Sequence, residues 1–139
     1  MNPNYERPTN EEELSSLANG YMMQYGVNIN LQRAIPHVAD GLKPITRRIL
    51  YMVYKNHRMN KVKVSVAIGE VMAIKPHGDQ GMGGVFARMA QKFSNNIPLI
   101  STEETGNSGN ATSGGDFASP RYLDIKLSKF AMDVFFDEF

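Results

Sequence analysis

The N-terminal third of the sequence has the apolar spacing of two helices. The first is expected from about residue 11 toward residue 25, because Thr9 and Asn10 each precede a glutamate by three positions, as in a capping box. The second is expected to begin near Lys43, where Pro44 suits the first turn of a helix. Apolar residues then recur at helical spacing at Ile45, Ile49, Met52 and Val53.

The middle of the sequence predicts two further helices separated by a tight turn. Residues 62–73 are expected to be helical, with an apolar stripe of Val66, Gly69 and Ala73, although the start of this segment also alternates like a strand. A turn is predicted over residues 75–78, which contain proline and glycine. A helix with Val85, Met89 and Phe93 on one stripe follows. Two short helices joined in this way indicate a helix-turn-helix.

The C-terminal third predicts a strand, a long loop and a last helix. Residues 97–101 form a short apolar strand candidate, and residues 102–119 are rich in glycine, serine, asparagine and threonine. That stretch is expected to form a wing beside the helix-turn-helix, and its glycines either cradle phosphate or are simply flexible. After Pro120 a helix is predicted, with Leu123, Leu127, Phe130 (or Ala131) and Val134 on its stripe. The predicted fold is therefore mainly α with a small β wing (α+β), a winged-helix arrangement.

Composition and charge narrow the class of protein. The 139 residues favour one domain, and the absence of cysteine excludes disulfides and thiolate metal sites and favours an intracellular protein. No apolar run is long enough for a membrane span. Net charge is −3 over residues 1–32, +8 over residues 33–92 and −4 over residues 93–139, which sums to the +1 of the whole chain. A basic middle suits a polyanionic partner, and a solvated face of mixed charge is the alternative.

Five motifs, in order, resemble the A-type subunit of type II DNA topoisomerases, the family that contains the A subunits of DNA gyrase and topoisomerase IV. The resemblance runs from about residue 11 to the end of the chain, over the N-terminal part of the breakage-reunion domain. The motifs are the run Arg33-Ala-Ile-Pro-His-Val-Ala-Asp-Gly-Leu-Lys-Pro-Ile-Thr-Arg-Arg-Ile-Leu-Tyr51, then Pro76-His77-Gly78-Asp79, Arg88-Met89-Ala90-Gln91, Gly106-Asn107 with Gly109, and Arg121-Tyr122.

This resemblance implies an ATP-dependent topoisomerase subunit that cleaves and religates DNA. Tyr122 would be the catalytic nucleophile that forms a 5′-phosphotyrosine link, since a covalent intermediate splits one difficult step into two easier ones. Arg121 would stabilise the phenolate and the phosphate. His77 would take the proton, directly or through water, or would hold a phosphate. The expected DNA-binding residues, which would position backbone phosphates rather than read bases, are Arg33, Lys43, Arg47, Arg48, Lys75 and Arg88.

The resemblance also implies partners and cofactors that lie outside this sequence. No metal ligands are expected here, and the companion B-type subunit would supply the acidic ligands of Mg²⁺ and the ATP site. The expected assembly is a homodimer within an A2B2-like complex on double-stranded DNA in the cytoplasm, without a membrane partner. Residues 1–30 would form an N-terminal arm helix, and residues 31–139 would form a winged-helix DNA-cleavage domain truncated after the tyrosine helix. Alone, the chain is expected to be inactive.

Departures from the family pattern leave two other interpretations open. Lys75 stands where a histidine is usual, and Gly81, Gly83 and Gly84 are expected to loosen the recognition helix, because each glycine costs about 1 kcal/mol relative to alanine. One alternative is a helix-turn-helix module that only binds DNA. The other is an inactive topoisomerase fragment that binds the companion subunit. The Arg121-Tyr122 pair argues against the first, because a DNA-binding regulator has no use for it.

Overall fold

The computed structural model describes residues 11–74, 79–95, 97–102, 106–112 and 115–136. The chain forms two compact units, residues 1–44 and residues 45–139. The first unit consists of the helix α1 (Glu11–Ile29), the π-helix η1 (Asn30–Ala34) and a turn closed by the hydrogen bond that the Gly41 amide donates to the His37 carbonyl. The predicted arm helix is thus present and reaches further than residue 25. The division into an arm of residues 1–30 and a domain of residues 31–139 stays a prediction.

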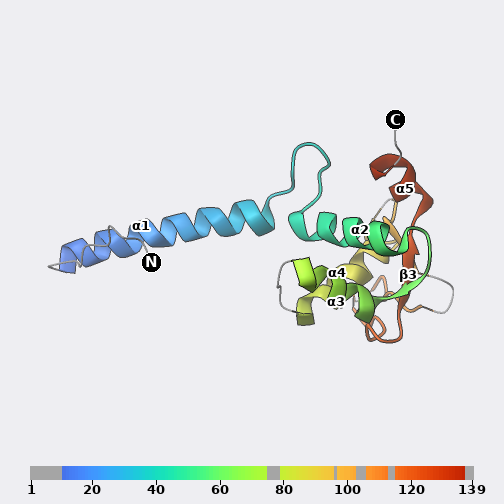
Figure 1. Cartoon of the computed structure of the whole chain (residues 1–139). Helices are drawn as coiled ribbons and strands as arrows, with labels where there is room; N and C mark the ends of the chain where they lie inside the picture. Colours follow the sequence, from blue (N-terminus) through green and yellow to red (C-terminus); the bar gives the residue numbers. More distant parts are fainter. Residues whose placement is uncertain (1–10, 75–78, 96, 103–105, 113–114, 137–139) are drawn as a thin grey trace. The chain divides into compact units, whose positions relative to one another are not determined.

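The second unit packs helices against a small antiparallel sheet (Figure 1). Its helices are α2 (Pro44–His57), α3 (Val64–Ile74), α4 (Asp79–Ala90) and α5 (Lys129–Phe135), and its strands are β1 (Val62–Lys63), β2 (Ile100–Thr102) and β3 (Asp124–Leu127). The predicted starts of α2 and α4 are confirmed. The turn predicted over residues 75–78 lies outside the described residues. The mainly α architecture with a small β wing is confirmed.

Strand β3 is the central strand of the sheet and forms hydrogen bonds with both edge strands, β1 and β2. It pairs with β1 at Val62↔Ile125 and with β2 at Ile100↔Leu127, both in antiparallel register. Alternate residues of β3 face the interior, so that Ile125 and Leu127 are buried. The core that they join also contains Ile49, Leu50, Val53, Val64, Val71, Met82, Phe86 and Leu123.

The helix predicted directly after Pro120 is wrong. Residues 120–122 form a turn, residues 124–127 form β3, and a helix begins only at Lys129, where the Ser128 hydroxyl accepts a hydrogen bond from the Ala131 amide. Leu123, Ile125 and Leu127 alternate with polar residues, so the strand period was also present in the sequence. Pairing on both sides of β3 decides between the two periods, because only an extended segment completes both ladders.

The stripes predicted for α3 and α4 are also wrong in part. The side chain of Val66 is half exposed, and the buried face of α3 carries Val64, Ala67 and Val71 instead. Almost every residue of α3 is apolar, so several stripes fit its sequence equally well. Helix α4 ends at Ala90, which leaves Phe93 outside the helix and partly exposed, while Met82 and Phe86 occupy the core. Of the stripe predicted on α2, Ile49, Met52 and Val53 are buried and Ile45 is half-buried.

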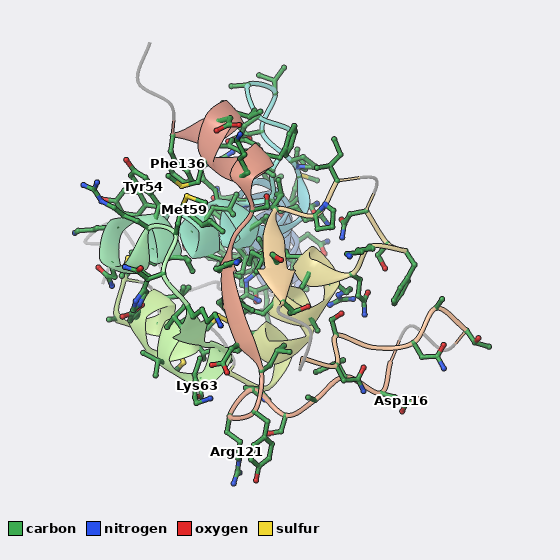
Figure 2. All side chains as sticks on the ribbon, turned by 90° about the vertical axis from the view of Figure 1, so that its right-hand side faces the viewer. Tyr54, Met59, Lys63, Asp116, Arg121 and Phe136 are labelled. Atoms are coloured by element: carbon green, nitrogen blue, oxygen red, sulfur yellow. The ribbon has the colours of Figure 1, made fainter. Side chains whose placement is uncertain are left out.

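Two side-chain contacts hold the end of α2 to its neighbours. The His57 Nε2 atom lies 3.0 Å from both carboxylate oxygens of Glu70, which connects α2 to α3. The rings of Tyr54 and Phe136 stack with their centroids 4.0 Å apart and an interplanar angle of 3°. Figure 2 shows this aromatic pair, with Met59 nearby, at one end of β3 and Arg121 at the opposite end. Helix α5 is therefore anchored away from the turn that carries Tyr122.

Candidate functional site

Tyr122 lies on a tight turn just before β3, and its side chain faces solvent. The exposed fraction of this residue is 70%. Its amide donates a hydrogen bond of 2.8 Å to the Ser119 carbonyl, which closes the turn. The phenol is therefore not buried in apolar packing, and a bulky ligand can reach it.

The N-terminus of α3 fixes the backbone on both sides of Tyr122. The Val64 amide donates to the Leu123 carbonyl at 2.9 Å, and the Ser65 amide donates to the Pro120 carbonyl at 3.1 Å. The first amides of a helix have no partner within the helix, so these bonds satisfy donors that would otherwise need water. Leu123 anchors the same turn in the core, because its side chain is buried. The exposed phenol thus projects from a well-held backbone.

Helix α4 approaches the same turn through a glycine. An added Cβ at Gly83 would lie 2.9 Å from the Cγ atom of Pro120, closer than real Cβ atoms come to their neighbours. At Gly84 an added Cβ would lie 3.7 Å from the Cζ atom of Phe117. Gly83 therefore does more than lower the helix propensity of α4: its missing side chain lets the segment before Tyr122 pack directly against the helix.

The glycines of α4 give a matched pair of substitutions. An added Cβ at Gly81 meets nothing within 4 Å, so we expect Gly81→Ala to raise the free energy of unfolding by about 0.5–1 kcal/mol through helix propensity. Gly83→Ala has the same gain in propensity, but Pro120 must move, so we expect a net loss of stability of about 1–3 kcal/mol. Urea unfolding of both variants measures the difference. Equal effects would contradict the close packing at Gly83.

Arg121 places a positive charge beside the phenol ring. The Cζ atom of its guanidinium lies 5.9 Å from the centroid of the Tyr122 ring, within the range of a cation–π contact. Figure 2 shows its side chain projecting away from the domain beyond the end of β3. Close by, the Lys63 Nζ atom lies 3.1 Å from an oxygen of Asp124, two residues after the tyrosine. This exposed ion pair adds little stability, but it offsets the negative charge of Asp124.

The other predicted site residues fall into three groups. Arg88 is exposed on α4, and its Nε atom donates to the Gly84 carbonyl at 3.2 Å, next to Phe117 in the segment that leads to Tyr122. Arg47 and Arg48 are half-buried near the start of α2. A third group is not placed relative to the tyrosine: Arg33 and Lys43 are exposed in the first unit, and Lys75 and His77 lie outside the described residues.

Within the ranges that the structure describes, no three His, Cys, Asp or Glu side chains lie close enough together to hold a metal ion. In the same ranges, no helix has the length and apolar character needed to cross a membrane.

Comparison with known proteins identifies the family. Residues 33–138 match the family model of the A subunit of DNA gyrase/topoisomerase IV. The chain belongs to this family. It is similar to the A subunit of DNA topoisomerase 4 of Caulobacter vibrioides, with 38% identity over 88% of the chain and 16% of the relative's length. It is also similar to the DNA gyrase A subunits of Buchnera aphidicola (38% identity, 91% of the chain, 15% of the relative) and of Spiroplasma citri (37%, 87% and 53%).

The chain thus spans about a sixth of the length of the first two of these relatives. The matched region of the family begins at residue 33, so it includes the Arg121-Tyr122 turn and all of the second unit up to residue 138. Helix α1 precedes it. The resemblance that the five sequence motifs indicated is confirmed.

The sequence did not predict any structural role for Gln91, although this residue lies inside one of the five family motifs. Gln91 closes the Arg88-Met89-Ala90-Gln91 motif, in which the sequence predicts a role for Arg88 alone. Gln91 is 1% exposed, and its side-chain amide donates to the Ser108 carbonyl at 2.7 Å. The signal in the sequence was the position of Gln91, a polar residue directly after an apolar helical stripe. If such a residue is buried, its amide requires hydrogen-bond partners.

Proposed function

We propose that this chain carries the DNA-cleaving tyrosine of a type II topoisomerase. The observation that carries the proposal is Tyr122 itself: an exposed phenol on a turn that α3 and α4 hold in place, with the Arg121 guanidinium beside its ring. A tyrosine that serves only packing would bury its ring. A nucleophile that attacks a polymer must instead present its oxygen outward from a rigid support.

The reaction balances without an external energy source. The Tyr122 oxygen attacks a backbone phosphorus, a bond forms between the phenol oxygen and phosphorus, and the bond from phosphorus to the 3′ oxygen of the preceding nucleotide breaks. The phenol proton passes to a base, for which His77 is the candidate, and the leaving 3′ oxygen acquires a proton. Religation is the reverse reaction, because the tyrosine ester retains the energy of the broken phosphodiester. Arg121 would stabilise the negative charge that develops during both steps.

The remaining machinery is proposed to come from partners. A companion B-type subunit would hold Mg²⁺ near the cleaved phosphate and would bind ATP, since the described part of this chain has no fitting ligand cluster. A second copy of the A-type chain would supply the tyrosine for the other strand, within an A2B2-like complex in the cytoplasm. The test is whether a denaturing detergent traps a covalent adduct between this chain and duplex DNA when magnesium and the companion subunit are present.

DNA binding by this chain is expected to depend strongly on salt. Each phosphate neutralised by a lysine or arginine contributes about −0.9 to the slope of log K against log salt concentration. We expect Arg88→Ala to reduce the magnitude of this slope by about one unit on any duplex sequence. Fluorescence anisotropy with a short labelled duplex at several salt concentrations measures the slope.

The matched control for Arg88 is Lys55, an exposed base on α2 whose Nζ atom lies 5.9 Å from the centroid of the Tyr51 ring. Lys55 belongs to no family motif, so Lys55→Ala is expected to leave the salt slope unchanged. Equal changes in the two variants would mean that Arg88 contributes only to a diffuse positive charge.

A further inference from the structure

Gln91 stands at a junction between α4 and the long loop that precedes Tyr122. Its side chain is almost completely buried, and both ends of its amide have partners: Nε2 donates to the Ser108 carbonyl at 2.7 Å, and Oε1 accepts from the Ser94 hydroxyl at 2.8 Å. An amide buried without partners costs about 1–3 kcal/mol, so these bonds oblige Ser108 to stay against the end of α4.

The backbone next to Ser108 is shaped to fit this amide. Gly109 has a φ of +113°, which side-chain-bearing residues rarely adopt. A Cβ added there would lie 2.7 Å from the Gln91 Nε2 atom and 2.8 Å from the Gly115 carbonyl oxygen. The glycine therefore permits both the positive φ and the close approach of the loop to Gln91.

Asn107 connects this part of the loop to residues 116–118 by hydrogen bonds. Its Nδ2 atom donates to the Asp116 carbonyl at 2.8 Å, and its own carbonyl accepts the Ala118 amide at 2.8 Å. The Asn107 Oδ1 atom also accepts the Gly109 amide at 2.9 Å. The described parts of the loop are thus cross-bonded, which favours an ordered structure over plain flexibility.

From Ala118 the chain enters the tyrosine turn within four residues. Pro120 packs against Gly83, and the Tyr122 amide bonds the Ser119 carbonyl. The segment before the tyrosine is therefore attached to α4 at two places, through Gln91 at the C-terminal end of the helix and through Gly83 nearer its start.

We propose that Gln91 is a positioning residue for DNA cleavage: through the hydrogen bonds of residues 107–109 and 116–118 it sets the placement of the Tyr122 turn relative to α4. Its side chain is 1% exposed, so in this proposal it acts through the loop and not by contact with DNA. This inference rests on the proposed function, because it assigns Gln91 to the cleavage step of that site. A role in positioning predicts a loss in the rate of cleavage at saturating DNA without a loss of DNA affinity.

Two variants test the proposal from the two sides of the contact. Gln91→Met keeps the size of the side chain but removes the bond to Ser108, and Gly109→Ala forces the loop away from an intact Gln91. With a B-type subunit of this family, magnesium and a short linear duplex, both should form the covalent adduct about 10- to 100-fold more slowly at saturating DNA. Their dissociation constants for the duplex should match that of the parent chain. The double variant should be no slower than the worse single variant, because both remove one contact.

A control at the same helix end separates positioning from general stability. The Asn95 Nδ2 atom donates to the carbonyls of Arg88 and Gln91, so Asn95→Ala weakens the end of α4 without removing a bond to the loop. It should form the adduct at the parental rate. If Asn95→Ala slows cleavage as much as Gln91→Met does, or if the two loop variants cleave at the parental rate, the positioning role is overturned.

Amide hydrogen exchange decides the inference independently of activity. In Gln91→Met the Ala118 and Tyr122 amides should exchange about 10-fold faster or more, while core amides of α2 keep their protection. Unchanged exchange at both amides would overturn the positioning role even if the parent chain cleaves DNA. A parent chain that forms no adduct with its companion subunit would instead overturn the proposed function, and faster exchange in the variant would still support the anchorage by Gln91.

Discussion

Tyr122→Phe is expected to abolish the covalent protein–DNA adduct while duplex binding stays nearly unchanged. The substitution removes the attacking oxygen and keeps the aromatic ring that Arg121 contacts. Because 70% of this residue is exposed, the change should cost the fold almost nothing. The measurement combines the chain with its companion subunit, magnesium and labelled DNA, and detects detergent-trapped adducts on a denaturing gel. Loss of a nucleophile leaves no route to a covalent link, so the expected yield is zero within detection.

Tyr51 supplies a matched control for this experiment. It is also half exposed or more, and it also has a basic neighbour, since the Lys55 Nζ atom lies 5.9 Å from its ring centroid. Tyr51→Phe should form the adduct at the parental level. An adduct that persists in Tyr122→Phe would remove the proposed nucleophile, and the chain would then be interpreted as a DNA-binding module or as an inactive fragment.

The second large effect concerns the stability of the sheet. Ile125→Ala should lower the free energy of unfolding by about 2–5 kcal/mol, because its side chain is 1% exposed in the central strand and its removal leaves a cavity. Small domains have a total stability of about 5–15 kcal/mol, so this loss is large. Urea unfolding followed by circular dichroism measures it.

The same substitution distinguishes between two assignments of residues 124–127: the strand of the structure and the helix that the sequence predicted. In a helix with Leu123 and Leu127 on its buried stripe, Ile125 would point to the opposite side and its loss would cost little. Phe130, one of the two residues predicted for the same position of that stripe, is instead 38% exposed, whereas its alternative, Ala131, is buried. We therefore expect Phe130→Ala to be less destabilising than Ile125→Ala. The reverse order would contradict the assignment of β3.

Prediction from the sequence was successful where local chemistry decides the outcome. Pro44 marks the first residue of α2, and the stripe of Ile49, Met52 and Val53 faces the core as its spacing indicates. Family membership was inferred from the ordered motifs, and the family match over residues 33–138 confirms it. The catalytic role of the Arg121-Tyr122 pair stays a prediction. The start and the buried stripe of α2 depend on residues close together in the chain, and each family motif is a short run of residues, so no knowledge of distant packing was needed.

Prediction was less successful where two local patterns compete or where a side chain has a distant partner. Residues 123–127 fit both a helical and a strand period, and pairing with β1 and β2 selects the strand. The glycines of α4 read as weak helix formers, but the approach of Pro120 gives Gly83 a packing role that no local rule contains. The partner of Gln91, at Ser108, lies 17 positions along the chain.

By itself, the sequence determined where α2 and α4 begin, the basic middle of the chain and the family motifs, among them the one that contains Tyr122. Only the tertiary structure decided that this phenol stands on an exposed turn held by the first amides of α3 and by a glycine of α4. The physical reason is that helix starts depend on neighbouring residues, whereas the setting of Tyr122 depends on hydrogen bonds and close contacts between segments that folding brings together from positions 64, 83 and 120.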